Sequence, residues 1–299
     1  MSILLDQSAR VVVLGITGRL GRFSAKDLVG YGTNVVAGVS PNRSSSNVEG
    51  VPVFRNTAQA VSETAADVAI IYVPSPLALD AVLAAFDAGI RLVAYPGDGL
   101  PVADAMEMRA AARANGAWLV GPNSPGIISP GRAKLGFMPN LCFKPGHVGV
   151  ISRSGSLSYE ASQRLSSADF GQSTVIGIGG DPVKGVTAAE AIAMFHEDPE
   201  TKMVVYLGEI GGADEYAVAD YASRPGSKPV AALLVGRTAP PGKKMGHAAA
   251  FIGSLADTWS SKVDALERSG VEVARSIEGL VHAASKAAAR NKTTVPDIL

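Results

Sequence analysis

Residues 10–21 have the sequence Arg-Val-Val-Val-Leu-Gly-Ile-Thr-Gly-Arg-Leu-Gly, and this stretch decides the fold. A strand-like apolar run at residues 10–14 leads into a G-x-x-G-x-x-G turn, Gly15 to Gly21, that opens a helix-like segment. Glycines at such a turn let backbone N–H groups at a helix amino end approach a phosphate. A tight strand-to-helix turn needs glycine even without a ligand, so the turn alone leaves binding open.

The same alternation of short apolar strands and alanine-rich helices continues along the chain and predicts two doubly wound α/β domains. In the first, we expect strands at residues 10–14, 34–39, 68–73, 92–94 and 117–120, and helices at 18–31, 76–88 and 102–115. In the second, we expect strands at 148–152, 173–178, 203–207, 230–235 and 271–273, and helices at 156–168, 187–197, 213–222, 260–269 and 277–290. Prolines and glycines between the two series predict a long ordered connection. The predicted limits are 1–123 and 146–299 for the domains and 124–145 for the connection.

Composition narrows the class of protein. The 299 residues carry 27 Lys plus Arg against 27 Asp plus Glu, so no global charge favours nucleic acid or a membrane as a partner. The single cysteine, Cys142, excludes an internal disulfide and is typical of a small buried hydrophobe rather than a nucleophile. With no apolar run long enough to span a membrane and no signal-like start, we expect a cytoplasmic protein.

The strand that follows the glycine turn indicates what the first domain binds. It ends in Val39-Ser40-Pro41-Asn42-Arg43, without the acidic residue that takes the ribose hydroxyls of NAD. Arg43 suits a ligand with a phosphate on its ribose, and coenzyme A and NADP both qualify. It is equally compatible with a solvated loop charge.

Four small or polar loops follow strands of the second domain, at residues 153–156, 177–182, 208–212 and 240–250, so they are expected at one edge of its sheet. Ser154-Gly155-Ser156 places hydroxyls and a glycine at a helix amino end, which suits a phosphate. His247 lies in the loop Pro240-Pro241-Gly242-Lys243-Lys244-Met245-Gly246-His247-Ala248-Ala249-Ala250. Glu209, in Gly208-Glu209-Ile210-Gly211-Gly212, is a natural partner for one N–H of an imidazole, leaving the other nitrogen to attack. Each loop alone could be a mere turn, but together the loops predict a histidine that accepts a phosphoryl group.

With these loops, the chain resembles the α subunits of succinyl-CoA synthetase and relatives such as malate-CoA ligase, over nearly its whole length. The matching motifs are Gly-Pro-Asn-Ser-Pro-Gly at 121–126, Ser-Arg-Ser-Gly-Ser-Leu-Ser-Tyr-Glu at 152–160, Gly-Ile-Gly-Gly-Asp-Pro at 177–182, Gly-Glu-Ile-Gly-Gly at 208–212 and Thr-Ala-Pro-Pro-Gly-Lys-Lys-Met-Gly-His-Ala at 238–248. The resemblance implies a Rossmann-like CoA-binding domain followed by a flavodoxin-like ligase domain.

The resemblance also implies an activity, partners and residue roles. The chain would be the α subunit of an NDP-forming acid-thiol ligase that joins a small dicarboxylate, succinate or similar, to coenzyme A through a phosphohistidine and an acyl phosphate. An ATP-grasp β subunit would hold ATP or GTP and Mg²⁺, in a heterodimer or heterotetramer. His247 would be the phosphohistidine and Glu209 its orienting partner, with Tyr159 near the carboxylate substrate. Coenzyme A would contact Thr17, Gly18, Arg19, Leu20, Arg43, Pro96, Gly97 and Asp98. No metal ligand is expected on this chain.

Departures from the family pattern lie mainly where coenzyme A is expected. Pro41-Asn42-Arg43-Ser44-Ser45 stands in place of Pro-Gly-Lys-Gly-Gly, and Gly97-Asp98-Gly99-Leu100-Pro101 in place of Thr-Glu-Gly-Ile-Pro. Alternatives are therefore a divergent paralogue that activates another carboxylate for a different acceptor, and a noncatalytic CoA-binding regulatory subunit. An NADP dehydrogenase is the weakest of the alternatives, since the first domain presents no acid–base pair beside a cofactor.

Overall fold

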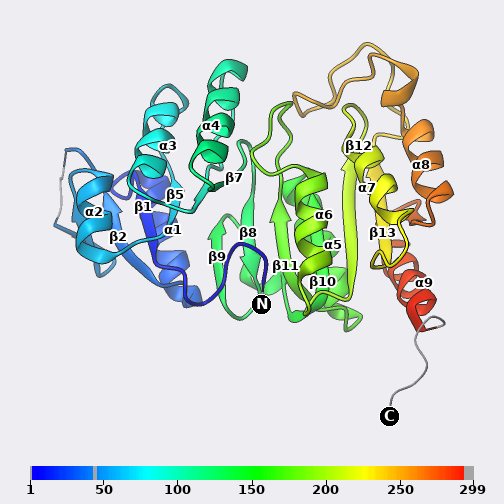
Figure 1. Cartoon of the computed structure of the whole chain (residues 1–299), viewed down its shortest axis with the longest axis horizontal. Helices are drawn as coiled ribbons and strands as arrows, with labels where there is room; N and C mark the ends of the chain where they lie inside the picture. The colour runs from blue at the N-terminus through cyan, green and yellow to red at the C-terminus, as the bar shows by residue number, and fades with distance from the viewer. Residues whose placement is uncertain (1, 43–45, 293–299) are drawn as a thin grey trace. The chain divides into compact units, whose positions relative to one another are not determined.

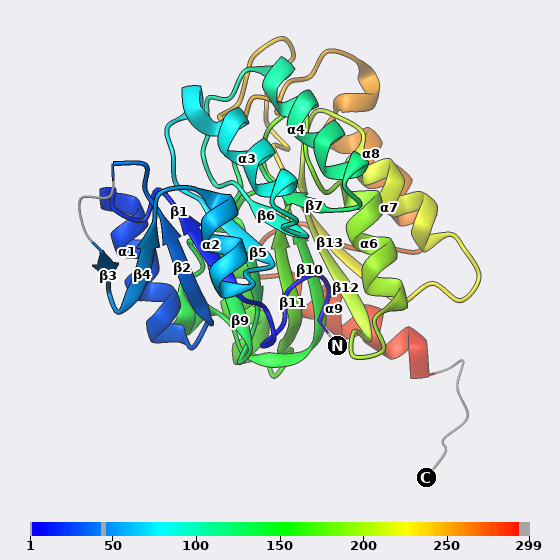
Figure 2. The ribbon, with the colours of Figure 1, turned by 60° about the vertical axis from the view of Figure 1, so that its left-hand side comes forward.

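The computed structural model describes residues 2–42 and 46–292. Its backbone contacts divide the chain into two compact units. The first comprises Leu4–Asn140 and Gly177–Val186; the second comprises Leu141–Ile176 and the described residues from Thr187 onward, with the start of the chain. The predicted domain limits, 1–123, 124–145 and 146–299, stay a prediction. Figures 1 and 2 show the elements of both units.

The first unit is built on a sheet with the strand order β3-β4-β2-β1-β5-β6-β7. From β4 to β7 every neighbouring pair is parallel, and β3 joins the edge antiparallel. Without β3, the order in chain sequence is 3-2-1-4-5-6, which is the doubly wound Rossmann arrangement. The strands are β1 (Val11–Leu14), β2 (Val35–Val39), β3 (Asn47–Val48), β4 (Val51–Phe54), β5 (Val68–Ile71), β6 (Leu92–Ala94) and β7 (Trp118–Val120).

Helices cover both faces of this sheet. In one layer α2 (Thr57–Thr64), α3 (Ala78–Asp87) and α4 (Val102–Ala114) contact one another in turn, while α1 (Arg19–Tyr31) lies on the other face (Figure 2). The elements β4 and α2 were not predicted from the sequence, because β4 is only four residues long with a proline among them and only three of the eight residues of α2 are apolar. The antiparallel hairpin of β8 (Gly126–Ser129) and β9 (Ala133–Gly136), which lies inside the predicted connection, was not predicted either. Its flanking prolines and glycines hide the strand pattern there.

The second unit contains a sheet in which five strands follow the order β14-β13-β12-β10-β11. Read from β11 to β14, with these five strands numbered in chain order, the sheet has the order 2-1-3-4-5, which is flavodoxin-like. The predicted fold class, a Rossmann-like domain followed by a flavodoxin-like one, is confirmed. The strands are β10 (Pro145–Ser152), β11 (Gln172–Gly177), β12 (Met203–Glu209), β13 (Val230–Val235) and β14 (Glu272–Ala274).

In this unit α6 (Ala188–Glu197), α7 (Asp214–Ala222) and α8 (Trp259–Arg268) form one layer, whereas α5 (Gly155–Ser167) contacts α9 (Leu280–Lys292). The chain turns in opposite directions after β10 and after β11, so a topological switch point lies beside β10, at its border with β12. Ligands bind outside the carboxyl ends of the strands at such a point. Among the described residues, no helix is both long and apolar enough to cross a membrane.

Candidate active site

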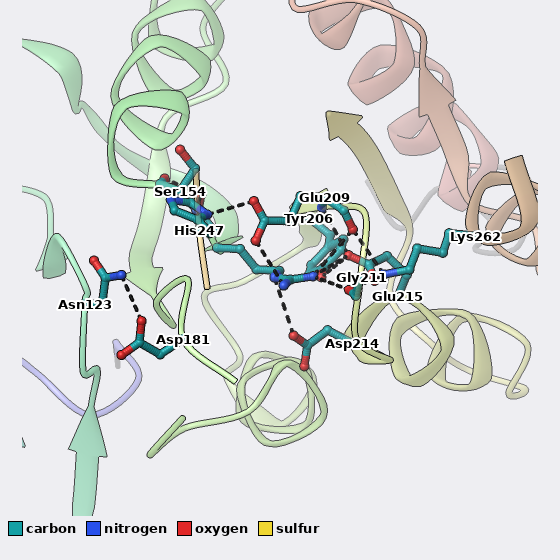
Figure 3. A network of polar contacts seen from close by, with 12 residues as sticks. Asn123, Ser154, Asp181, Tyr206, Glu209, Gly211, Asp214, Glu215, His247 and Lys262 are labelled. Carbon is teal, nitrogen blue, oxygen red and sulfur yellow. Dashed lines mark hydrogen bonds and ion pairs between the residues drawn. The ribbon is translucent and has the colours of Figure 1, made fainter. Parts of the chain in front are cut away.

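His247 and Glu209 meet at the carboxyl end of β12 (Figure 3). Glu209 is the last residue of that strand and its side chain is 7% exposed, whereas that of His247 is 31% exposed. Nδ1 of His247 lies 2.7 Å from Oε2 of Glu209. A carboxylate only accepts hydrogen bonds, so Nδ1 carries the proton and Nε2 presents its lone pair. The structure thus brings together the predicted nucleophile and its predicted partner.

The loop that carries His247 is held against β12 by a small apolar cluster. Ala250 and Ile252 pack on Ile210, the residue after Glu209. Gly211 permits this approach, since a Cβ there would stand 2.1 Å from the carbonyl oxygen of Ala249. Backbone hydrogen bonds from Met245 N–H to Ala250 O and from Ala250 N–H to His247 O shape the turn around the histidine. The backbone conformation of this loop, and not a bulky neighbouring side chain, therefore orients the imidazole ring of His247.

Charged side chains that the sequence analysis left without a role surround Glu209. Arg153 lies 3.0 Å from its Oε1, and behind it lie Glu215 and Lys262, both fully buried. One signal in the sequence pointed to Lys262, because it occupies the buried stripe of α8 beside Val263 and Leu266, where a lysine needs partners. Arg153 is part of a recognised motif, but nothing in the pattern tells where its side chain points.

Ser154, Gly155 and Ser156 form the amino end of α5, directly after β10. Ser154 is the N-cap, and its Oγ accepts the N–H of Leu157 at 3.4 Å. Since β10 and β12 are neighbouring parallel strands, this helix end and Glu209 lie at the same edge of one sheet. The positive end of the helix dipole favours an anion there.

Tyr159 lies one turn into α5 and packs edge-to-face on Phe143, with ring centroids 6.4 Å apart. Burial raises the pKa of its hydroxyl to about 12, so at neutral pH the group is neutral and can donate a hydrogen bond. Its predicted place near the carboxylate substrate stays a prediction.

In the first unit, the predicted CoA residues lie at the carboxyl edge of the Rossmann-like sheet. Gly18 is the N-cap of α1 and gives no side-chain cap, which leaves first-turn N–H groups for a phosphate. A Cβ on Gly21 would lie 2.1 Å from the carbonyl oxygen of Gly15, so only glycine allows this tight turn. Thr17 hydrogen-bonds to Ser40 at the end of β2, and Leu20 is 56% exposed.

The remaining predicted CoA contacts divide into two groups. Pro96, Gly97 and Asp98 follow β6 at the same sheet edge. Arg43 lies outside the described residues. The turn, the uncapped helix end and the exposed apolar side chain suit a phosphate-bearing ligand with an organic tail.

A second polar pair near Gly97 was also missed. Nδ2 of Asn123 donates to Oδ1 of Asp181 at 2.9 Å, and the N–H of Asn123 donates to the carbonyl oxygen of Gly97 at 2.8 Å. The motifs that contain Asn123 and Asp181 were recognised, but 58 residues separate the two side chains, and only the fold shows that they pair.

Comparisons with known proteins identify the family of the chain. A family model described as CoA binding domain matches residues 6–95, and one described as CoA-ligase matches residues 151–289. Succinate–CoA ligase (ADP-forming) subunit alpha 1 of Archaeoglobus fulgidus is 48% identical, over 94% of this chain and 96% of that protein. The corresponding subunit alpha of Aquifex aeolicus is 49% identical, over 91% and 90%. That of Staphylococcus epidermidis is 44% identical, over 92% and 91%.

Solved structures support the fold. ATP citrate lyase from Methanothrix soehngenii, in complex with citrate and coenzyme A, matches 99% of this chain and 52% of its own, with a TM-score of 0.89 and 23% identity. A dinucleotide-forming acetyl-coenzyme A synthetase from Ca. Korarchaeum cryptofilum matches 92% of this chain and 60% of its own, with a TM-score of 0.75 and 22% identity. At such identities the likeness concerns the fold alone, and the sequence relatives decide the family. The chain belongs to the succinate–CoA ligase α-subunit family.

Proposed function

We propose that this chain is the α subunit of an NDP-forming acid-thiol ligase that joins succinate or a similar small dicarboxylate to coenzyme A at the expense of ATP or GTP. The contact between Nδ1 of His247 and Glu209 carries the proposal, since it leaves Nε2 as a nucleophile at a sheet edge suited to phosphate. Family membership supports it, because the relatives named above are succinate–CoA ligase subunits. The match to the CoA binding domain supports coenzyme A as the thiol.

In the first step Nε2 of His247 attacks the γ-phosphorus of the nucleotide. The bond from that phosphorus to the bridging oxygen breaks, and its electron pair leaves with the nucleoside diphosphate. The ring keeps the proton on Nδ1 and becomes positively charged, so the ionised carboxylate of Glu209 stabilises the product at 2.7 Å. The amino end of α5 at Ser154, Gly155 and Ser156 would hold the phosphoryl oxygens.

In the second step a carboxylate oxygen of the acid takes the phosphoryl group, and His247 recovers its lone pair. Tyr159, neutral at the working pH, would donate a hydrogen bond to the acid. Shielding the acyl phosphate from water is the main task of the site at this stage. The thiol of coenzyme A then displaces phosphate. Thr17, Gly18, Arg19, Leu20, Arg43, Pro96, Gly97 and Asp98 would hold this co-substrate and position its thiol.

The α subunit of such an enzyme works with a β subunit. We propose an ATP-grasp partner that holds the nucleotide and Mg²⁺, in a heterodimer or heterotetramer, which light scattering of the purified complex distinguishes. The lone Cys142 suits a reducing compartment, so we place the complex in the cytoplasm.

The test uses the chain co-purified with its β partner. Incubation with Mg²⁺ and γ-³²P-labelled ATP or GTP should place an acid-labile label on His247, and addition of succinate and coenzyme A should remove it and form a thioester. An unlabelled complex contradicts the proposal. Product analysis across a panel of acids and acceptors addresses the divergent alternative, because label that is discharged only by another acid, or without coenzyme A, identifies a different acceptor.

A further inference from the structure

Five charged side chains are clustered behind the His247–Glu209 contact in the second unit. They are Arg153 between β10 and α5, Glu209 at the end of β12, Asp214 and Glu215 at the start of α7, and Lys262 on α8. Arg153, Glu215 and Lys262 are at most 1% exposed, and Asp214 is 15% exposed. The cluster thus contains three carboxylates and two cations. While His247 is neutral, its negative charges therefore exceed its positive charges by one.

Arg153 and His247 each contact a different oxygen of the Glu209 carboxylate. Nη2 of Arg153 lies 3.0 Å from Oε1, and Nδ1 of His247 lies 2.7 Å from Oε2. Arg153 is itself fixed, because its Nη1 donates to the carbonyl oxygen of Gly211 at 2.8 Å and lies 3.6 Å from Oε1 of Glu215. The guanidinium therefore determines which oxygen of Glu209 faces the histidine.

A second layer holds this arrangement in place (Figure 3). Nζ of Lys262 donates to the carbonyl oxygens of Glu209 and Gly211 and pairs with Oε2 of Glu215. Oε1 of Glu215 accepts from the Tyr206 hydroxyl at 2.8 Å and from the N–H of Glu209 at 3.2 Å. Backbone and side chain of Glu209 are thus held by the same cluster, which leaves its carboxylate little freedom to rotate.

Charge explains why a cation is needed here. A buried carboxylate without a neighbouring cation tends to take up a proton, and a protonated carboxyl group would donate a hydrogen bond to the imidazole ring instead of accepting one from it. Burial lowers the pKa of Arg153, but Tyr206 and the carboxylates of Glu215, Glu209 and Asp214 outweigh it and raise the pKa above its ordinary value. The guanidinium therefore stays charged where it contacts Oε1 of Glu209.

We propose that Arg153 is a positioning residue for phosphorylation of His247: by holding Oε1 of Glu209, it keeps Oε2 turned toward Nδ1 of His247, so that Nδ1 bears the proton and Nε2 attacks. The inference deepens the proposed function and rests on it for the phosphoryl step.

The first experiment measures the tautomer of His247 in the full chain by ¹H–¹⁵N correlation at about pH 8, above the ordinary range of histidine titration. The peak is assigned by its absence from His247→Asn. The test variant is the double change Arg153→Met with Glu215→Gln, which removes one cation and one anion and so preserves the net charge of the cluster. Arg164→Met, an exposed arginine of α5 paired with Glu160, is the matched control.

The wild-type chain and the control should show a protonated Nδ1, whereas the double variant should shift toward the Nε2–H tautomer. Circular dichroism checks that each variant folds. Where the double variant does not fold, Arg153→Gln, which removes the cation but keeps a polar side chain, decides by the same measurement. A fully retained Nδ1–H tautomer in a folded variant overturns the inference.

The second experiment follows phosphorylation in the complex with the β subunit and Mg-ATP. We expect the labelling rate to fall about 100-fold or more in the double variant, and ³¹P spectra to reveal label on Nδ1 beside that on Nε2. Wild-type rate and position in the variant contradict the inference. If the wild-type complex takes no label, the proposed function fails, while the tautomer measurement still decides on Arg153.

Discussion

Single residues of the second unit carry the proposed chemistry, and they were unequally visible in the sequence. The contact between His247 and Glu209 could be predicted because a histidine in a glycine-bounded loop and a glutamate at a strand end are unusual in a parallel α/β sheet. Arg153 and Lys262 could not be assigned in the same way. Their function depends on side-chain direction in a buried cluster, and the periodicity of a strand or helix does not specify which long side chains converge.

Replacement of His247 by asparagine should abolish labelling from γ-³²P-ATP in the complex. The side chain lies in a partly exposed loop, so the free energy of unfolding should change by no more than about 0.5 kcal/mol. Labelling and thermal unfolding are measured together. His147→Asn, at an exposed histidine whose Nδ1 contacts the carbonyl oxygen of Glu200, should leave both unchanged. Residual label in His247→Asn means that another residue accepts the phosphoryl group.

Glu209→Gln should slow labelling of His247 by about 10²–10⁴-fold. Arg153 attracts the carbonyl oxygen of the new amide to the position of Oε1, which turns the NH₂ group toward Nδ1. The ring must then accept there and carry its proton on Nε2, the atom that attacks. Single-turnover labelling measures the effect, with Glu160→Gln on the exposed side of α5 as the control. A rate within twofold of wild type would show that Glu209 does not set the tautomer.

Elements were predicted well where each strand is followed directly by its own helix. The strand at Val230–Val235 and the one at Leu92–Ala94 have the predicted bounds. The missed elements, β4, α2 and the β8–β9 hairpin, are four to eight residues long and lie among prolines, glycines or polar residues. Short elements bury few side chains, so tertiary pairing rather than local pattern decides that they form.

Gly211→Ala should separate the His247 loop from the end of β12. Gly211 has φ 77° and its Cβ would collide with Ala249, whereas Gly212 has φ 68° and its Cβ would come no closer than 3.9 Å to Arg153. An alanine at either position costs about 1–2 kcal/mol of backbone strain in the left-handed region, so both variants should lose a similar amount of unfolding free energy from this strain. Gly211→Ala alone adds a clash with the His247 loop. It should therefore slow labelling of His247 at least tenfold more than Gly212→Ala does. Equal rates would mean that loop contact with Gly211 is unimportant.

The proposed site residues of the whole chain fall in two doubly wound units. The predicted CoA residues Thr17 to Leu20 and Pro96 to Asp98 belong to the first, and His247, Glu209 and Arg153 belong to the second. Both architectures could be predicted from the sequence because their βα units repeat the strand–turn–helix pattern that begins at Gly15. The identity of the acyl acceptor could not, since it depends on how a ligand fits the substituted loops at Arg43 and Gly97.

This division predicts that CoA binding and histidine phosphorylation are separable. Coenzyme A at 100 times its Kd should stabilise the native chain by about 2.7 kcal/mol, which raises Tm by several degrees. His247→Asn should give the same shift, because the predicted CoA residues that the structure describes lie in the other unit. Dephospho-coenzyme A should give a smaller shift, since Arg43 is the predicted partner of the 3′-phosphate, and NADP none. Differential scanning fluorimetry measures all four cases. A shift with NADP but not with coenzyme A would identify the glycine turn as a dinucleotide site and remove the thiol acceptor from the proposed reaction.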